Sequence, residues 1–206
     1  MMEILFIIFI IPVILLSIIF HEYSHGWMAY KLGDPTPKDS GRLTFNPLAH
    51  IDLFGTIILP LISAFVFGFI FGYAKPVPIN PYHFKNPRKD IMYVGLAGPA
   101  ANIIIAALLV LLFKLPIPAL QELLIPAIIL NLILAIVNLM PIPPLDGSKV
   151  FAFFLPNDLA YKYLRIGTYG LFILYFLVLS GFFFRFVRII IVFLFRYLLN
   201  LNIEAM

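Results

Sequence analysis

Long runs of hydrophobic residues dominate this chain, and short polar stretches separate them. The runs cover residues 4–30, 54–72, 91–113, 120–140 and 165–201. A helix needs ~20 apolar residues to cross ~30 Å of hydrocarbon, so the first, third and fourth runs predict membrane-spanning helices. The last run is long enough for two elements, with a break predicted between Gly181 and Arg185.

The run at 54–72 is less regular, because it contains three glycines and one proline. It is either an ordinary span or a re-entrant element that returns to the side it came from, where irregular backbone is sheltered by protein. The loops at 31–53 and 73–90 are both basic, which favours the re-entrant alternative because both loops then lie on the cytoplasmic side. The arginines at 185, 188 and 196 leave a similar choice between an interfacial helix and a last span.

Composition agrees with a membrane protein. Of the 206 residues, 63% are hydrophobic and 12% are charged, and the mean hydropathy is +1.05. A soluble domain of this length does not cover so much apolar surface. The net charge of +4 calls for no nucleic-acid partner, and the lack of cysteine excludes disulfides and thiolate metal sites. The N-terminal run lacks the basic start of a signal peptide and is expected to be retained as a span.

The first run ends in His21-Glu22-Tyr23-Ser24-His25, an H-E-x-x-H motif. Histidines four residues apart project from one face of a helix, where both imidazoles can bind one zinc ion. Glu22 between them can act on water at the metal. The alternative is a pair of histidines that only form hydrogen bonds within a bundle. Three ionisable groups in one membrane-embedded turn are costly and typically functional, which favours the metal.

A third ligand is needed, because catalytic zinc sites usually have three protein ligands. The best candidate is Asp146, which follows the fourth hydrophobic run. Three prolines at 141–144 are predicted to end the helix and force an extended path, and Gly147 permits close backbone approach. The alternative is an ordinary turn at a membrane exit. The predicted topology places Asp146 and the motif at similar depth near the cytoplasmic face, which favours the ligand.

Together, the two motifs resemble the site-2 protease family, zinc metalloproteases that cut substrates within the membrane. The resemblance covers residues 15–155 and is closest to the minimal members without PDZ or CBS domains. It implies one zinc per chain held by His21, His25 and Asp146, with Glu22 as the catalytic acid and base. Gly95–Asn102 resembles the central core helix of the family. Gly72–Asn80 resembles the loop beside the active site in its short members.

Several residues are candidates for contact with substrate. The amides of Asn102 and Asn138 can pair with a substrate backbone, although buried amides also serve as links between helices. The loop that begins at Lys75, Pro76 and Val77 is predicted to pair with an unwound substrate as an added strand. The histidines at 50 and 83 lack motif spacing and are predicted to be surface or turn residues.

The predicted fold is therefore all-α and integral to the membrane. Five to six transmembrane or re-entrant segments surround a three-helix catalytic core, with a short extended loop near the active site. One domain covers residues 1–206, with the core at 4–155 and further membrane segments at 165–203. The predicted activity is hydrolysis of peptide bonds in single-span membrane proteins, in a prokaryotic plasma membrane. The alternatives are a membrane metal transporter, which typically shows internal repeats absent here, and a non-catalytic scaffold. The oligomeric state does not follow from the sequence.

Overall fold

The computed structural model describes residues 2–67, 72, 74–167, 169–170, 172, 176–177 and 180–199. Regular structure in these ranges is helical throughout, without a strand. The helices are α1 (Met2–Lys31), α2 (Thr36–Asp39), η1 (Pro47–Ala49), the π-helix η2 (Leu53–Ile58), α3 (Leu59–Phe67), η3 (Pro81–His83), α4 (Pro87–Phe113), α5 (Pro118–Asn138), α6 (Asp146–Phe154), α7 (Asn157–Arg165) and α9 (Phe182–Leu199). The prediction of an all-α fold is confirmed.

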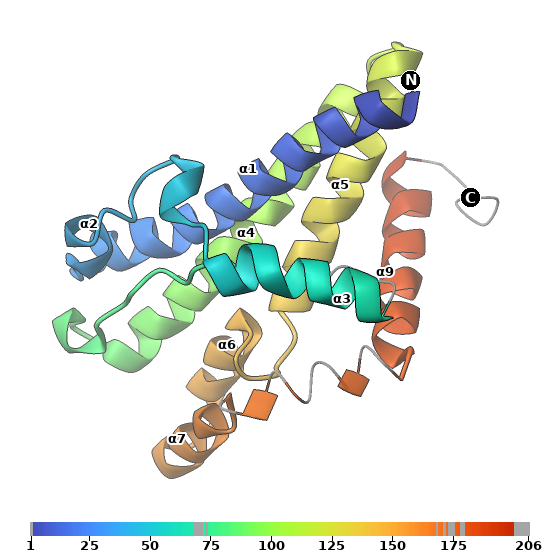
Figure 1. Ribbon diagram of the computed structural model, residues 1–206. Coiled ribbons are helices and arrows are strands. Elements are labelled where there is room, and N and C mark those ends of the chain that lie inside the picture. The colour runs from blue at the N-terminus through green and yellow to red at the C-terminus, as the bar shows by residue number, and fades with distance from the viewer. Residues whose placement is uncertain are drawn as a thin grey trace.

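Three long helices, α1, α4 and α5, form the centre of the molecule, and α4 packs against both of the others (Figure 1). In the described part of the chain, three helices are long and apolar enough to cross a membrane. They cover Phe9–Lys31, Pro87–Phe113 and Pro118–Asn138. These are the first, third and fourth hydrophobic runs of the sequence, so the predicted core spans are confirmed in position.

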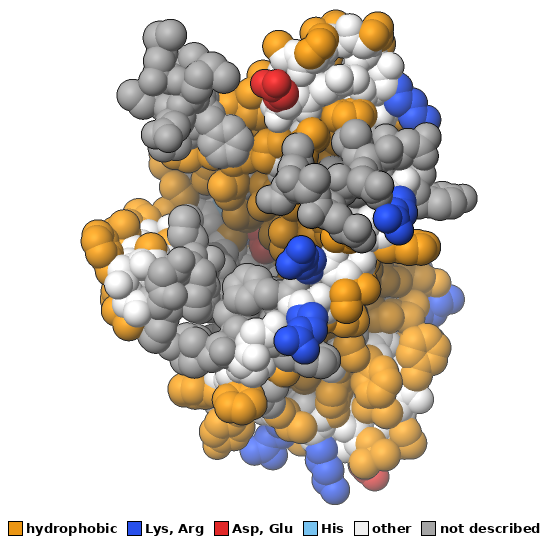
Figure 2. Space-filling view, turned by 90° about the vertical axis from the view of Figure 1, so that its right-hand side faces the viewer, with side chains coloured by type: hydrophobic (Ala, Val, Ile, Leu, Met, Phe, Trp, Pro, Cys, Tyr) orange, Lys and Arg blue, Asp and Glu red, His pale blue; other side chains and the backbone are white. Residues whose placement is uncertain are grey.

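The outer surface of the molecule is strongly apolar. Large hydrophobic side chains are exposed, among them Phe65 at 89% and Phe176 at 70%. Figure 2 shows one such face, on which Lys and Arg side chains appear singly or in pairs among hydrophobic ones. Soluble monomers rarely expose contiguous apolar surface of this extent. Together with the three long apolar helices, this surface identifies the chain as a membrane protein.

The described part of the run at 54–72 is helical. Helices η2 and α3 together extend from Leu53 to Phe67, which at 1.5 Å per residue gives about 22 Å. That is less than the ~30 Å of a hydrocarbon core. In Figure 1, α3 is steeply inclined to α5 rather than aligned with it. Residues 68–71 lie outside the described part of the chain, so the choice between a span and a re-entrant element stays a prediction.

The predicted break in the last run occurs at Gly181, whose φ of +73° favours glycine. Helix α9 begins at the next residue and packs against α5, with Val187 and Ile191 buried in a cluster that α4 and α5 share. Its exposed arginines at 185 and 188 lie away from that contact. Much of the run before Gly181 lies outside the described residues.

A buried carboxylate, that of Asp34, ties the segment after α1 to the segment before α4. It accepts hydrogen bonds from the backbone N–H of Thr36 (3.0 Å) and of Asn80 (2.7 Å), and from the hydroxyl of Thr36 (2.6 Å). His83 Nδ1 lies 2.9 Å from the same carboxylate. Burial alone would raise the pKa of Asp34, but these hydrogen bonds outweigh it and hold the pKa below its ordinary value.

Asp34→Asn is expected to destabilise the fold by about 1–3 kcal/mol at neutral pH, because an amide leaves at least one of these donors without an acceptor. A depressed carboxyl pKa contributes stability that is lost as the pH falls through the folded-state pKa. The difference in melting temperature between parent and variant should therefore shrink in acid. Thermal unfolding of parent and variant in detergent, at neutral pH and in acid, tests this prediction. Asp39→Asn, at an exposed position, is the control and should change little; an Asp34 effect that persists in acid contradicts the assignment.

Candidate metal centre

The two histidines of the motif lie on one side of α1, where it faces α4 and α5. A spacing of four residues places His21 and His25 one above the other on the helix, and their ring centroids are 4.7 Å apart. Only 6% of His21 and 5% of His25 is exposed. The part of α1 before the motif is apolar. The two imidazoles are therefore polar groups buried at the end of an apolar helix.

Asp146 reaches the histidines as predicted, because the chain breaks after α5. Helix α5 ends at Asn138, and Asp146 is the first residue of α6. A Cβ on Gly147 would overlap the backbone of Leu139 and lie 2.6 Å from the oxygen of Met140. Gly147 therefore allows the start of α6 to fold back onto the end of α5. The N-terminus of a helix also stabilises the negative charge of the carboxylate.

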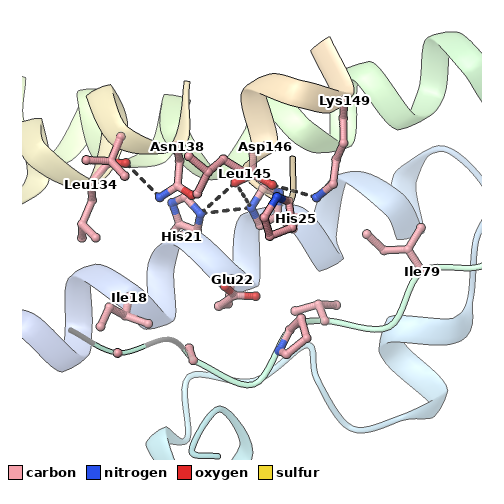
Figure 3. A pocket seen from close by; sticks show the side chains of 16 residues that line it. Ile18, His21, Glu22, His25, Ile79, Leu134, Asn138, Leu145, Asp146 and Lys149 are labelled. Carbon is pink, nitrogen blue, oxygen red and sulfur yellow. Dashed lines mark hydrogen bonds and ion pairs between the residues drawn. The ribbon is translucent and has the colours of Figure 1, made fainter. Parts of the chain in front are cut away.

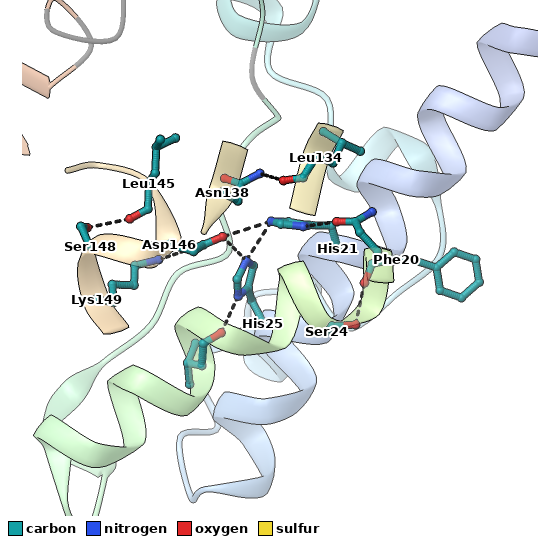
Figure 4. Close-up of polar contacts among 12 residues, drawn as sticks. Phe20, His21, Ser24, His25, Leu134, Asn138, Leu145, Asp146, Ser148 and Lys149 are labelled. Atoms are coloured by element: carbon teal, nitrogen blue, oxygen red, sulfur yellow. Dashed lines mark hydrogen bonds and ion pairs between the residues drawn. The ribbon is translucent and has the colours of Figure 1, made fainter. Parts of the chain in front are cut away.

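The three side chains converge on one point (Figure 4). His21 Nε2 and His25 Nε2 are 3.1 Å apart, and Asp146 Oδ2 lies 3.2 Å from the first and 3.0 Å from the second. A tetrahedral zinc with bonds of ~2.0–2.1 Å has its ligand atoms about 3.3 Å apart. The triangle thus has the edge lengths of one face of a zinc coordination tetrahedron. Two imidazoles and one carboxylate are a donor set that catalytic zinc accepts.

Each ligand is held by a further partner. His25 Nδ1 donates to the backbone oxygen of Val94 on α4 (2.6 Å), and His21 Nδ1 lies 2.5 Å from Oδ1 of Asn102. The second oxygen of Asp146, Oδ1, accepts from Lys149 Nζ at 2.7 Å. These contacts turn Nε2 of each ring and one carboxylate oxygen toward the shared point, as outer partners of metal ligands do.

The carboxylate of Asp146 is held in its ionised form. Burial alone would raise its pKa, but hydrogen bonds with His21 and His25 and the charge of Lys149 outweigh it and hold the pKa well below its usual range. Metal ligands must be deprotonated, so this environment suits the role of a zinc ligand.

Gly98 on α4 lies directly against the ligand atoms. A Cβ at this position would come within 2.7 Å of His21 Nε2 and closer still to His25 Nε2. From the sequence, Gly98 is expected only to permit close helix packing. The structure shows that its missing side chain also leaves room in front of the two imidazoles. A glycine one helix away from the motif carries no signal in the sequence that predicts this contact.

Glu22 lines a pocket that it shares with the two histidines and Asp146. The pocket is lined by Ile18, His21, Glu22, His25, Gly72, Ala74, Pro76, Val77, Ile79, Leu134, Val137, Asn138, Pro144, Leu145, Asp146 and Lys149. In Figure 3, Glu22 projects from α1 toward the extended segment that carries Ile79. The three candidate metal ligands, the carboxylate of Glu22 and apolar walls thus share one cavity.

The structure separates the residues predicted to contact substrate. Asn138, Pro76 and Val77 line the pocket, whereas Lys75 does not. Asn102 is fully buried behind His21 and is absent from the pocket wall. This corrects the expectation that its amide reaches the substrate: on α4 it faces the interior of the bundle, and its oxygen is occupied by His21.

The segment at 74–80 passes the pocket in an extended form and is fixed at both ends. At one end, Lys75 N–H donates to the backbone oxygen of His50 (3.0 Å). At the other end, Asn80 is bonded to Asp34. His50 itself is only 3% exposed, with Nε2 2.9 Å from the oxygen of Thr44. The sequence predicts His50 to be a surface or turn residue, and it lies in the turn that ends η1, with its side chain buried.

Comparison with known proteins finds three relevant relatives. The chain is 37% identical over 173 residues to "Putative zinc metalloprotease YwhC" of Bacillus subtilis, covering 79% of this chain and 76% of that protein. It is 32% identical over 144 residues to "Putative zinc metalloprotease Rip2" of Mycolicibacterium smegmatis and 28% identical over 137 residues to the protein of that name from Mycobacterium tuberculosis. Each of these matches covers 65% of this chain and 52% of the relative, so the chain spans about half their length. No family model and no solved structure matches.

Proposed function

Because the chain belongs to the zinc metalloprotease family of Bacillus subtilis YwhC, we propose that it hydrolyses peptide bonds within the membrane, in the manner of site-2 proteases. The observation that carries this proposal is the position of the metal centre. His21, His25 and Asp146 form a buried zinc-binding triangle, and two of them lie on a helix long and apolar enough to cross a bilayer. The zinc cofactor itself follows from the family and from the fit of the three ligands.

Catalysis divides between the cofactor and the chain. Bound zinc supplies a Lewis acid that polarises a carbonyl and makes water more acidic. Glu22, which lines the same pocket, takes the proton from the attacking water and gives it to the leaving amine. His21, His25 and Asp146 hold their donor atoms 3.0–3.2 Å apart, and their outer partners keep that arrangement during turnover.

The substrate proposal rests on the shape and lining of the pocket. A transmembrane helix hides its carbonyls in hydrogen bonds, so a bound substrate has to unwind at the cut. The extended 74–80 segment lies along the pocket and offers backbone groups with which an unwound chain pairs as an added strand. Asn138 stands on the opposite wall, where its Nδ2 donates to the oxygen of Leu134 (2.9 Å) and its Oδ1 accepts from the substrate backbone.

The proposed orientation follows from the basic loops. Residues 31–53 and 73–90 both carry Lys and Arg, and short cytoplasmic loops of membrane proteins are enriched in them. The short α3 element returns the chain to the same side. The chain is then a multi-pass protein of a bacterial plasma membrane, with the metal centre inside the bilayer and near its cytoplasmic face.

Zinc removal tests this function. Purified protein in detergent should cleave a single-span substrate, lose all cleavage on treatment with a chelator and recover it when zinc is returned. Loss and recovery are expected because no remaining group replaces the Lewis acid. Calcium or magnesium, which prefer sets of oxygen ligands, serves as the control addition and should not restore cleavage. Protein that binds zinc and cleaves no membrane substrate would contradict the proposal and favour a transporter or scaffold.

A further inference from the structure

A chain of buried polar side chains runs from the metal centre into the helix bundle. It consists of Asn102 on α4, Asn131 on α5 and Ser17 on α1. Both asparagines are fully buried, and Ser17 is 3% exposed. Buried amides in membrane bundles often serve only to link helices. Here each hydrogen bond has a fixed donor and acceptor, and together they determine which nitrogen of His21 carries the proton.

The orientation of the Asn131 amide is set by two oxygen atoms that accept hydrogen bonds from it. Its Nδ2 lies 2.9 Å from the backbone oxygen of Ala127 and 2.9 Å from Oγ of Ser17. The Ser17 hydroxyl donates to the backbone oxygen of Val13 at 2.8 Å, which leaves its oxygen free to accept. The atom of Asn131 near Ala127 must therefore be the nitrogen, and its Oδ1 faces Asn102.

The orientation of Asn102 follows from that of Asn131. Asn102 Nδ2 donates to Asn131 Oδ1 at 2.9 Å and, less closely, to the backbone oxygen of Ser17 at 3.3 Å. Its Oδ1 is thereby turned to His21 Nδ1, 2.5 Å away. An amide oxygen only accepts, so Nδ1 carries the proton. Nε2 then has the free lone pair that a zinc ligand needs.

We propose that Asn131, which contacts neither zinc ligand nor pocket, is a positioning residue of the metal centre. It holds the Asn102 amide in the orientation that selects the zinc-binding tautomer of His21. His25 needs no such residue, because its Nδ1 donates to the backbone oxygen of Val94, which cannot turn over. An Asn102 amide that turned over would direct N–H groups at His21 instead. The effect on catalysis rests on the proposed function, whereas the effect on zinc binding does not.

The test compares three variants of the full chain in detergent. Zinc affinity is measured by competition with a chelator, and ligand geometry by the visible spectrum of the cobalt-loaded protein. Removal of an outer partner typically costs 10–100-fold in metal affinity, so Asn102→Leu should lose about that much and Asn131→Leu about tenfold. Asn131→Asp should stay within about threefold of the parent. A buried carboxylic acid is neutral by preference and keeps one acceptor for Asn102 and one donor for Ala127.

Gln121→Leu is the matched control, because it removes an amide from the same helix at a position whose Nε2 donates to the backbone oxygens of Phe113 and Leu115, away from the metal centre. Its zinc affinity and cobalt spectrum should equal those of the parent. If Asn131→Leu does not fold, Asn131→Ser replaces it, since that hydroxyl is too short to reach Asn102. Parental affinity in the Leu or Ser variant would overturn the proposal. Equal losses in the Leu and Asp variants would also overturn it, because the Asp side chain keeps the acceptor for Asn102. Parent protein that binds zinc without cleaving substrate would contradict only the protease function.

Discussion

Glu22→Gln is expected to lower peptide hydrolysis by about 10²–10⁴-fold, the contribution of a well-placed general acid and base, while zinc stays bound. Glu22 lines the pocket beside the metal ligands and belongs to no part of the zinc-binding triangle. A Gln side chain has nearly the same size but cannot take up a proton from water. The loss should therefore appear in the cleavage rate, measured with a single-span substrate, and not in the zinc content.

Glu122→Gln is the matched control for this prediction. Glu122 is exposed in the first turns of α5 and lies outside the pocket lining. The same chemical change at that position should leave both cleavage and zinc content at parental levels. Equal cleavage by the Glu22→Gln variant and the parent would contradict the role assigned to Glu22. Loss of zinc from the variant would instead place Glu22 among the groups that hold the metal.

Gly98→Ala is expected to remove both zinc and activity. The added methyl group would lie within 2.7 Å of His21 Nε2 and closer to His25 Nε2, so both imidazoles have to turn away from the metal position. Their Nδ1 atoms are held by Asn102 and Val94, which leaves the rings little freedom to adjust. Zinc affinity should fall by about 100-fold or more, beyond the loss of one outer partner.

Gly26→Ala is the matched control for Gly98→Ala. It adds the same methyl group beside His25 in the sequence, but the nearest atoms belong to side chains of Leu43, Pro37 and Val77 at 3.1–3.3 Å. Those side chains can yield by a few tenths of an ångström, so zinc content should stay at the parental value. Full zinc occupancy in the Gly98→Ala protein would contradict the geometry of the metal centre.

The sequence predicted that His21, His25 and Asp146 lie together, from the spacing of the histidines and from the depth at which the predicted helices end. His21 and His25 share a helix face through their spacing alone, and the prolines before Asp146 predict the end of α5. The three core spans were predictable for the same reason, since helix length and hydrophobicity are read along the chain. Histidine spacing, the position of prolines and the length of an apolar run can each be read from a short stretch of sequence, and the structure agrees with these readings.

Other features depend on which helices pack together. Asn102 looked like a substrate contact because an amide in a span is compatible with a cleft or with the bundle interior. Its position on α4 against His21 decides between them. Gly98 and Asn131 act across helix contacts separated by tens of residues, which no local pattern reveals. His50 lies in a turn, as the sequence predicts, and the burial of its side chain depends on contacts formed only in the fold.

The position of the cut bond tests most directly whether this metal centre works within the membrane. Parent protein is reconstituted in lipid vesicles with a single-span substrate, and the products are identified by mass spectrometry, with Glu22→Gln protein as the blank. The predicted result is a zinc-dependent cut inside the apolar segment of the substrate, toward its cytoplasmic end. A cut confined to the polar flanks, or the same products from the Glu22→Gln protein, would contradict intramembrane proteolysis by this site.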